Sequence, residues 1–205
     1  MHTVPILVAL ALVTSVGGIS AAQMPTSPPG KMDTKLVTAG TYQVDPGHTQ
    51  VLFNYNHMGF TQNMGIIAMP EGSMTLDPKA PAKAKVIVTF PVTNLRTGVA
   101  DLDAHLMKSD FFDAVKFPTA IFESTSVTAQ GTTAKIVGNL TIKGITKPVT
   151  LNATFTGAGL NSFMKKDTIG FSAHGLIKRS DFGLGYGVPV VGDAIELTIT
   201  AAFEK

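Results

Sequence analysis

Residues 42–60 read YQVDPGHTQVLFNYNHMGF, and this stretch decides the class of fold. After an Asp-Pro-Gly turn at residues 45–47, where proline fixes φ and glycine admits positive φ, the residues alternate in character. A period of two is typical of a β-strand with one side in an apolar interior and the other near water. The side that we expect to face the interior carries Val51, Phe53, Tyr55 and His57.

Strand and turn signals continue to the C-terminus. The segment 101–112 (DLDAHLMKSDFF) is the exception, because its apolar spacing and its acidic start predict a helix of about three turns. Hairpin-compatible turns are expected at 130–131, 143–144 and 157–159. Further strands are predicted at 64–69, 72–76 (a short pair around Pro70), 84–92, 119–128, 133–142, 147–156, 168–178 and 194–203.

Strands of about ten residues with a single short helix favour an all-β fold, an antiparallel barrel or sandwich. The predicted strand 133–142 places Ala134, Ile136, Gly138, Leu140 and Ile142 on one face. Small residues among large ones on an inner face leave room, and a closed barrel of about eight strands can then hold one slender ligand.

Composition sets the limits on domain number and partners. The 205 residues carry a net charge of +2, and 15% of them are charged, which indicates one domain without the basic stripe of a nucleic-acid-binding protein. The chain has no cysteine, so a disulfide framework is excluded and stability depends on an ordinary core.

The N-terminus has the pattern of an exported protein. Residues 1–22 hold an apolar run followed by small residues, which predicts a signal peptide cleaved after Ala22 and a periplasmic location. The run is short for a membrane-spanning helix, which needs about 20 apolar residues. Residues 23–40 contain three prolines and are predicted to be a flexible leader, and residues 41–205 form the folded domain.

Metal binding and catalysis find little support in the sequence. His48, His57, His105 and His174 form no HExxH or HxH pair and have no cysteine or tight acidic cluster with them, so neither a metal nor another cofactor is expected. A GxSxG motif is absent from the sequence. Asp45 and His48 could form an acid-base pair, but Asp-Pro-Gly-His first indicates a turn in which the carboxylate accepts from backbone amides. No catalytic residue is therefore predicted.

Residues 179–187 (RSDFGLGYG) join the end of a strand to a glycine-rich loop. One interpretation is structural, an Arg179–Asp181 pair at the rim of a barrel. The other is a gate, in which Arg179 contacts an anionic or carbonyl head group while Phe182 and Tyr186 cover the pocket. The helical segment 101–112 either caps a barrel end in the same way or simply closes the core.

Four blocks of residues, in this order, carry a resemblance to a known family. They are Tyr42-x-Val44-Asp45-x-x-His48-Thr49-x-Val51-x-Phe53 with His57 and Gly59, His105-Leu106-x-x-Ser109-x-Phe111-Phe112-Asp113 with Phe117-Pro118 and Phe122, Gly138-x-Leu140-Thr141-x-x-Gly144, and Gly170-Phe171 with Arg179-Ser180-Asp181-Phe182-Gly183.

With these blocks the chain resembles the YceI family of secreted, lipocalin-like, polyisoprenoid-binding bacterial proteins from about Gly40 to the C-terminus. Tyr42 stands where the family usually has Trp, and Thr49 where Ser is common. The resemblance implies an eight-stranded antiparallel barrel with one short helix, whose internal apolar channel holds an isoprenoid chain in the periplasm. It also implies no reaction, and a role in isoprenoid quinone handling or in the response to alkaline or acid stress.

The leading hypothesis is thus a non-enzymatic carrier of a long apolar lipid. The alternative is an enzyme acting on a lipid or quinone, with His57 or His105 as acid-base and Arg179 holding the head group. Transient contact with a membrane or membrane protein, and a homodimer, are left open. The predicted ligand-binding residues are Val51, Phe53, Tyr55, His57, Val86, Val88, Phe90, His105, Phe111, Phe112, Phe122, Phe171, Arg179, Asp181 and Phe182.

Overall fold

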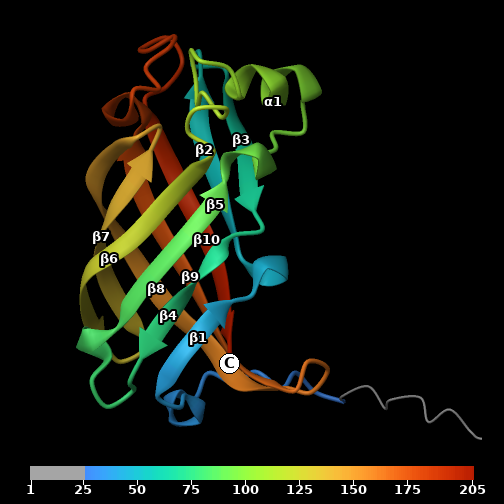
Figure 1. The fold of residues 1–205 in the computed structure, drawn as a ribbon, viewed down its shortest axis with the longest axis vertical. Coiled ribbons are helices and arrows are strands. Elements are labelled where there is room, and N and C mark those ends of the chain that lie inside the picture. Colours follow the sequence, from blue (N-terminus) through green and yellow to red (C-terminus); the bar gives the residue numbers. More distant parts are fainter. Residues whose placement is uncertain (1–25) are drawn as a thin grey trace, which may run out of the picture.

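A computed structural model describes residues 26–205, and in it the chain forms a closed antiparallel β-barrel with one short helix (Figure 1). The predicted signal peptide and the start of the predicted leader lie outside the described residues. The strands are β1 (Gly40–Val44), β2 (Gln50–His57), β3 (Thr61–Ala68), β4 (Glu71–Leu76), β5 (Lys85–Pro91), β6 (Thr119–Gln130), β7 (Thr133–Ile142), β8 (Ile145–Asn161), β9 (Lys166–Lys178) and β10 (Ala194–Glu204). The helix is α1 (Ala100–Leu106), and single 3₁₀ turns are η1 (Thr34–Leu36), η2 (Pro46–His48), η3 (Pro81–Lys83), η4 (Val92–Asn94) and η5 (Arg179–Phe182).

Ten strand segments make an eight-stranded barrel because two of the strands are interrupted. β1 and β2 both pair with β10 and are separated by η2, while β3 and β4 continue one another around Pro70. The sheet runs β1-β4-β5-β6-β7-β8-β9-β10 and closes where Val44 of β1 pairs with Phe203 of β10. The strand number that the resemblance implied is therefore correct. Of the two folds that the strand pattern allowed, a barrel and a sandwich, the chain forms the barrel.

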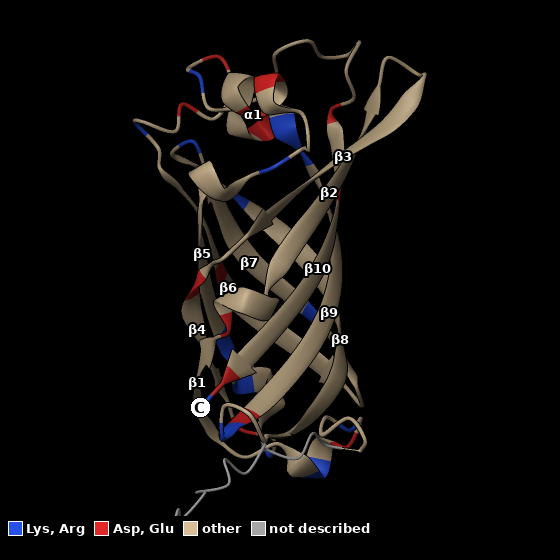
Figure 2. Cartoon of the chain, turned by 90° about the vertical axis from the view of Figure 1, so that its right-hand side faces the viewer, with Lys and Arg blue, Asp and Glu red and all other residues tan. Residues whose placement is uncertain are grey.

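The two ends of the barrel differ (Figures 1 and 2). At one end, which we call the mouth, α1 lies beside the β2–β3 turn, the β7–β8 turn and the loop 183–193. At the other, which we call the floor end, η1, the β4–β5 loop, the β6–β7 turn and the C-terminus gather. Within residues 26–205, α1 is far shorter than a membrane-spanning helix, and no helix there is long and apolar enough to cross a bilayer.

Three local predictions need correction. The predicted helix at 101–112 ends at Leu106, because the chain continues in turns whose backbone bonds are no longer helical: Phe111 N donates to the Lys108 carbonyl and Phe112 N to the Leu106 carbonyl. The two strands predicted around Pro70 are present as β3 and β4, but they do not pair with each other, since β3 pairs with β2 and β4 with β1 and β5.

The third correction concerns residues 157–159 (Gly-Ala-Gly), which do not turn. They lie within β8, after a bulge between Phe155 and Gly157, and the chain reverses only after Asn161. These glycines permit the close approach of another backbone, because a Cβ at Gly159 would lie 2.4 Å from the carbonyl oxygen of Pro29.

The predicted leader is partly ordered against the barrel. Lys31 pairs with Ala158, and Val37 is buried in the same core cluster as Tyr42 and Phe155. The hydroxyl of Tyr42 donates to the Thr38 carbonyl over 2.6 Å. Residues 31–38 thus make specific contacts across the floor end.

Gly138 of β7 provides a test of inner-face packing. Its missing side chain leaves room for the Phe122 ring, because a Cβ there would lie 2.4 Å from Phe122 Cζ and 2.6 Å from the backbone oxygen of Glu123. We expect Gly138→Ala to lower the free energy of unfolding by about 1–3 kcal/mol, since both neighbours must move. Urea denaturation measures the change. Gly185→Ala is the control, because its Cβ would meet its nearest atom at 3.9 Å, and an equal loss in both variants would contradict the argument.

Candidate ligand-binding cavity

A cavity of about 680 Å³ occupies the inside of the barrel. This volume lies within the roughly 300–1,000 Å³ of pockets that enclose drug-sized ligands. Side chains from β2 through β10, from α1 and from the loop 183–193 line the cavity, and most are apolar. The barrel interior is therefore an open cavity and not a solidly packed core.

All of the predicted ligand-binding residues except Asp181 line this cavity. The alternation seen in β2 places Val51, Phe53, Tyr55 and His57 inward, as expected. Asp181 is exposed, does not line the cavity and, among the ion pairs of residues 26–205, forms none with Arg179.

Sequence reasoning missed the inner faces of β8 and β10 and the polar Asn63 of β3. On β10, the alternation of Ile195, Leu197 and Ile199 with polar residues was a usable signal. Asn63 lies directly across from Tyr55 in the β2–β3 register, and both line the cavity. The lining residues missed on β8 and β10 are Val149, Leu151, Ala153, Phe155, Ile195, Leu197, Ile199, Ala201 and Phe203.

Three rings from two segments meet at the mouth. The ring centroids of His105 and Phe111 lie 4.9 Å apart, and those of Phe111 and Tyr186 lie 5.5 Å apart. Asp110 accepts from His105 Nε2 over 2.9 Å, and this hydrogen bond is the largest of the effects that together lower the pKa of Asp110. The helical segment and the loop 183–193 are thereby joined over the cavity.

Arg179 is the first residue of η5, which precedes this loop, and it is 8% exposed. Its Nε donates to the Gly192 carbonyl over 2.8 Å, and its Nη2 donates to the Val191 carbonyl over 2.9 Å. Its Nη1 donates to the carbonyls of Leu184 and Tyr186. Four of the five N–H groups of the guanidinium thus hold the loop 183–193 in place. Burial lowers the pKa of Arg179, against the opposing effect of Asp193.

Asp193 holds the other side of the loop. Its carboxylate accepts from Ser180 N over 2.9 Å and from Ser180 Oγ over 2.7 Å. Desolvation raises the pKa of Asp193, but the hydrogen bonds from Ser180 and the charges of Arg179 and Lys178 together outweigh it and lower the pKa.

The lowered pKa of Asp193 predicts an acid-dependent loss of stability. The carboxylate stabilises the fold fully above its unfolded pKa of about 3.9, and the contribution disappears as pH falls through the lower folded value. We expect Asp193→Asn to reduce the free energy of unfolding by a constant amount above about pH 5 and by less below about pH 4. Urea denaturation from pH 7 to pH 3 tests this, and a difference that grows on acidification would contradict it.

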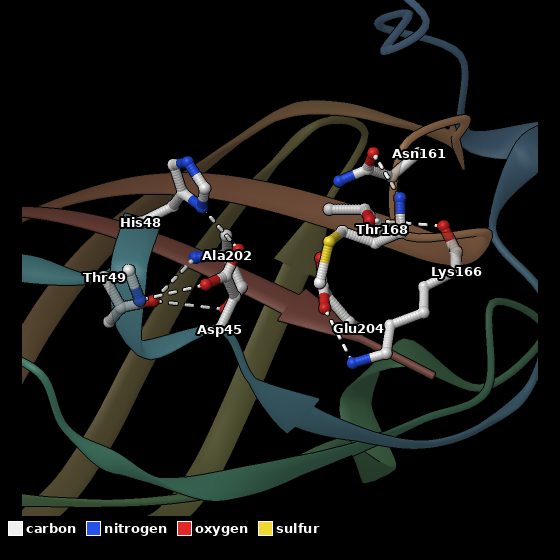
Figure 3. A network of polar contacts seen from close by, with 10 residues as sticks. Asp45, His48, Thr49, Asn161, Lys166, Thr168, Ala202 and Glu204 are labelled. Carbon is white, nitrogen blue, oxygen red and sulfur yellow. Dashed lines mark hydrogen bonds and ion pairs between the residues drawn. The ribbon is translucent and has the colours of Figure 1, made fainter. Parts of the chain in front are cut away.

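Asp45 and His48 do not line the cavity and belong to a polar network with Thr49 and Ala202 (Figure 3). The Asp45 carboxylate accepts from Gly47 N over 2.9 Å and lies 2.6 Å from His48 Nδ1. This confirms the predicted turn chemistry. In the same network, the hydroxyl of Thr49 both donates to and accepts from the backbone of Ala202.

The chemistry available in the cavity is limited. Of the side chains that line it in residues 26–205, none is Asp, Glu or Lys, and Arg179 is already bonded to carbonyls. No group of three or more His, Asp or Glu residues that could hold a metal ion occurs in that same part of the chain. The polar groups that face the cavity near the mouth are Tyr55, His57, Asn63, His105 and Tyr186.

A closed antiparallel barrel of eight strands around an internal, mostly apolar cavity places the chain in the class of lipocalin-like barrels. The family model for the YceI-like domain matches residues 42–203, and the chain belongs to the YceI family. Proteins named YceI from Salmonella arizonae and Salmonella paratyphi B are each 37% identical to it over 169 residues, which is 82% of this chain and 88% of each relative.

Solved structures agree with this assignment. BcnA of Burkholderia cenocepacia is 26% identical, with a TM-score of 0.69 over 78% of this chain and 98% of BcnA. The YceI protein of Campylobacter jejuni is 28% identical, with a TM-score of 0.64 over 73% of this chain and 89% of that protein. A polyisoprenoid binding domain from Saccharophagus degradans, implicated in plant cell wall breakdown, has the same fold at 12% identity, with a TM-score of 0.61 over 80% of this chain and 97% of that domain.

Proposed function

We propose that this protein is a periplasmic carrier that holds one long apolar lipid, a polyisoprenoid or an isoprenoid quinone, inside the barrel without chemical turnover. The observation that carries the proposal is the apolar cavity of about 680 Å³, which runs from the mouth to the floor end. Each CH₂ group moved from water into such a cavity contributes about 0.8 kcal/mol, so a chain of several isoprene units binds tightly without special chemistry. The polyisoprenoid binding domain with the same fold agrees with this choice of ligand.

The charge distribution supports a neutral head group. A diphosphate would have to leave water and find cationic donors, and four of the N–H groups of Arg179 already serve backbone carbonyls. A hydroxyl or a quinone carbonyl needs only one or two hydrogen bonds. Tyr55 and Asn63, which face each other across β2 and β3, offer them. We therefore favour a prenol or a quinone over a prenyl diphosphate.

The test is the content of the purified protein. Mass spectrometry of an organic extract, from the natural host and from a recombinant source, should show about one equivalent of an apolar compound with a neutral head group. After removal of that compound, the protein should bind a long prenol more tightly than the prenyl diphosphate of the same length. Extracts without stoichiometric lipid, together with no binding of either probe, would refute the carrier function.

A second candidate is catalysis on a lipid or quinone. The observation that favours it is the His105–Asp110 pair of 2.9 Å at the mouth, where a carboxylate orients an imidazole that lines the cavity. Turnover of candidate lipids that is lost in His105→Ala or His57→Ala, while bound lipid is unchanged, would support this candidate. Unchanged lipid content with no reaction in any variant would leave the carrier function alone.

A further inference from the structure

Residues 29–37, which we call the strap, lie across the floor end of the barrel. The strap precedes the first residue of the family match, Tyr42. Lys31 N donates to the Ala158 carbonyl over 3.0 Å, and Ala158 N donates to the Lys31 carbonyl over 2.9 Å. β7 begins at Thr133, which pairs with Thr154, so the part of β8 after Thr154 has no residue of β7 beside it. At Ala158 the strap pairs with this edge of β8 instead.

The Gly-Ala-Gly segment of β8 is shaped for this contact. A Cβ at Gly159 would lie 2.4 Å from the Pro29 carbonyl oxygen, and one at Gly157 would lie 3.4 Å from the Lys31 carbonyl oxygen. The contact therefore requires glycine at 159, because the strap backbone lies where a Cβ would be, whereas a Cβ at 157 would make an ordinary van der Waals contact. Past this contact, Asp33 caps η1 by accepting from Lys35 N over 2.9 Å, which turns the strap toward the barrel.

The strap then reaches the cavity itself. Thr34 and Val37 line the cavity together with Pro78 and Pro81 of the β4–β5 loop and Thr132 of the β6–β7 turn. Val37 is buried against the core cluster, so its position is fixed by packing. The polar groups described above lie at the opposite end of the cavity, beside α1, which makes the floor end the place for the tail of a ligand.

We propose that the strap is the length-determining element of the cavity, with Thr34 and Val37 as the stop for the end of a bound apolar chain. This inference rests on the proposed function and specifies which chains the cavity accepts. A chain whose head group is held near Tyr55 and Asn63 gains burial with each added unit until its end meets the strap. Further units must stay in water or force the chain to fold back, and the gain stops.

The experiment measures the affinity of delipidated protein for all-trans prenols of increasing length, with competition against a fluorescent lipid as the readout. In the unmodified protein, affinity should rise at least about tenfold per isoprene unit up to a limiting length and then level off or fall. Gly159→Val places side-chain atoms where Pro29 lies and should free the strap, so the limit should shift by at least one unit to longer chains. Thr34→Phe adds volume at the stop and should shift the limit to shorter chains.

Two controls separate the strap from general damage. Leu160→Val changes the neighbouring residue of β8, whose side chain is 57% exposed, and should leave the limit unchanged. Lys31→Pro removes the N–H that donates to the Ala158 carbonyl and should also free the strap. It takes the place of Gly159→Val if thermal unfolding shows that Gly159→Val does not fold. If the unmodified protein, a folded variant with a released strap and Thr34→Phe all show the same limiting length, the strap proposal is overturned and the proposed function is not. No binding of any prenol by the unmodified protein removes the proposed function and the strap proposal with it.

Discussion

Replacing Arg179 by leucine should lower the free energy of unfolding by about 3–5 kcal/mol, one of the two largest effects that we expect of a single substitution. The guanidinium is 8% exposed, and it donates to the carbonyls of Leu184, Tyr186, Val191 and Gly192. Leucine fills part of the volume but leaves these four carbonyls without the donor that they have in the native protein. The loop should therefore detach from the barrel.

Arg179→Lys should recover only part of this loss. The planar guanidinium donates in several directions at once, whereas the compact lysine ammonium cannot reach all four carbonyls. Urea denaturation gives the free energies, and limited proteolysis within residues 183–193 shows whether the loop is released. Lys178→Leu is the matched control, since Lys178 is exposed and precedes Arg179 in the chain. A loss below about 1 kcal/mol in Arg179→Leu would show that the carbonyls find water instead.

The behaviour of Arg179 also marks a limit of sequence reasoning. A cation at a strand end before a glycine-rich loop suggested a head-group contact. Nothing in the sequence showed that the backbone carbonyls of the loop would accept hydrogen bonds from that cation. Such bonds depend on the path of residues 184–192, which has no periodic pattern. By contrast, the alternation in β2 arises from the two-residue period of any strand and predicted its inner face.

The floor end shows the same contrast. Prolines in residues 23–40 predicted a flexible leader, and two glycines at 157 and 159 predicted a turn. In the structure, the part of that segment around Lys31 lies against these glycines. Each signal was ambiguous alone because glycine serves both a reversal and a close backbone contact. Pairs of segments far apart in sequence have no local signature, so only the three-dimensional structure relates them.

The size of the cavity could not be predicted from the sequence either. Small residues on the inner face of β7 suggested open space, yet the space at Gly138 is occupied by the Phe122 ring. Gly65 likewise accommodates Phe53, whose Cζ would lie 2.2 Å from an added Cβ. The cavity is what is left after such pairs have formed, and its volume depends on rotamers that no single strand determines.

Ile199→Trp should reduce the affinity for a long prenol about 50-fold by filling the middle of the cavity. Ile199 of β10 pairs with Val51 of β2 and Ala173 of β9, and all three line the cavity. The larger indole takes space that roughly three CH₂ groups of a ligand would use, and at about 0.8 kcal/mol each their loss is about 2.4 kcal/mol. Because the indole enters open space, the free energy of unfolding should change by less than about 1.5 kcal/mol.

Thr200→Trp is the matched control, since Thr200 is the next residue of β10 and is exposed on the outside of the barrel. Prenol binding to delipidated protein, measured by competition, should be weakened in Ile199→Trp and unchanged in Thr200→Trp. If both variants bind as the unmodified protein does, the lipid is held elsewhere. If both lose binding equally, the loss comes from general damage to β10. Weaker binding in Ile199→Trp but not in Thr200→Trp is expected only when the prenol chain occupies the barrel interior. The carrier function depends on that location of the lipid.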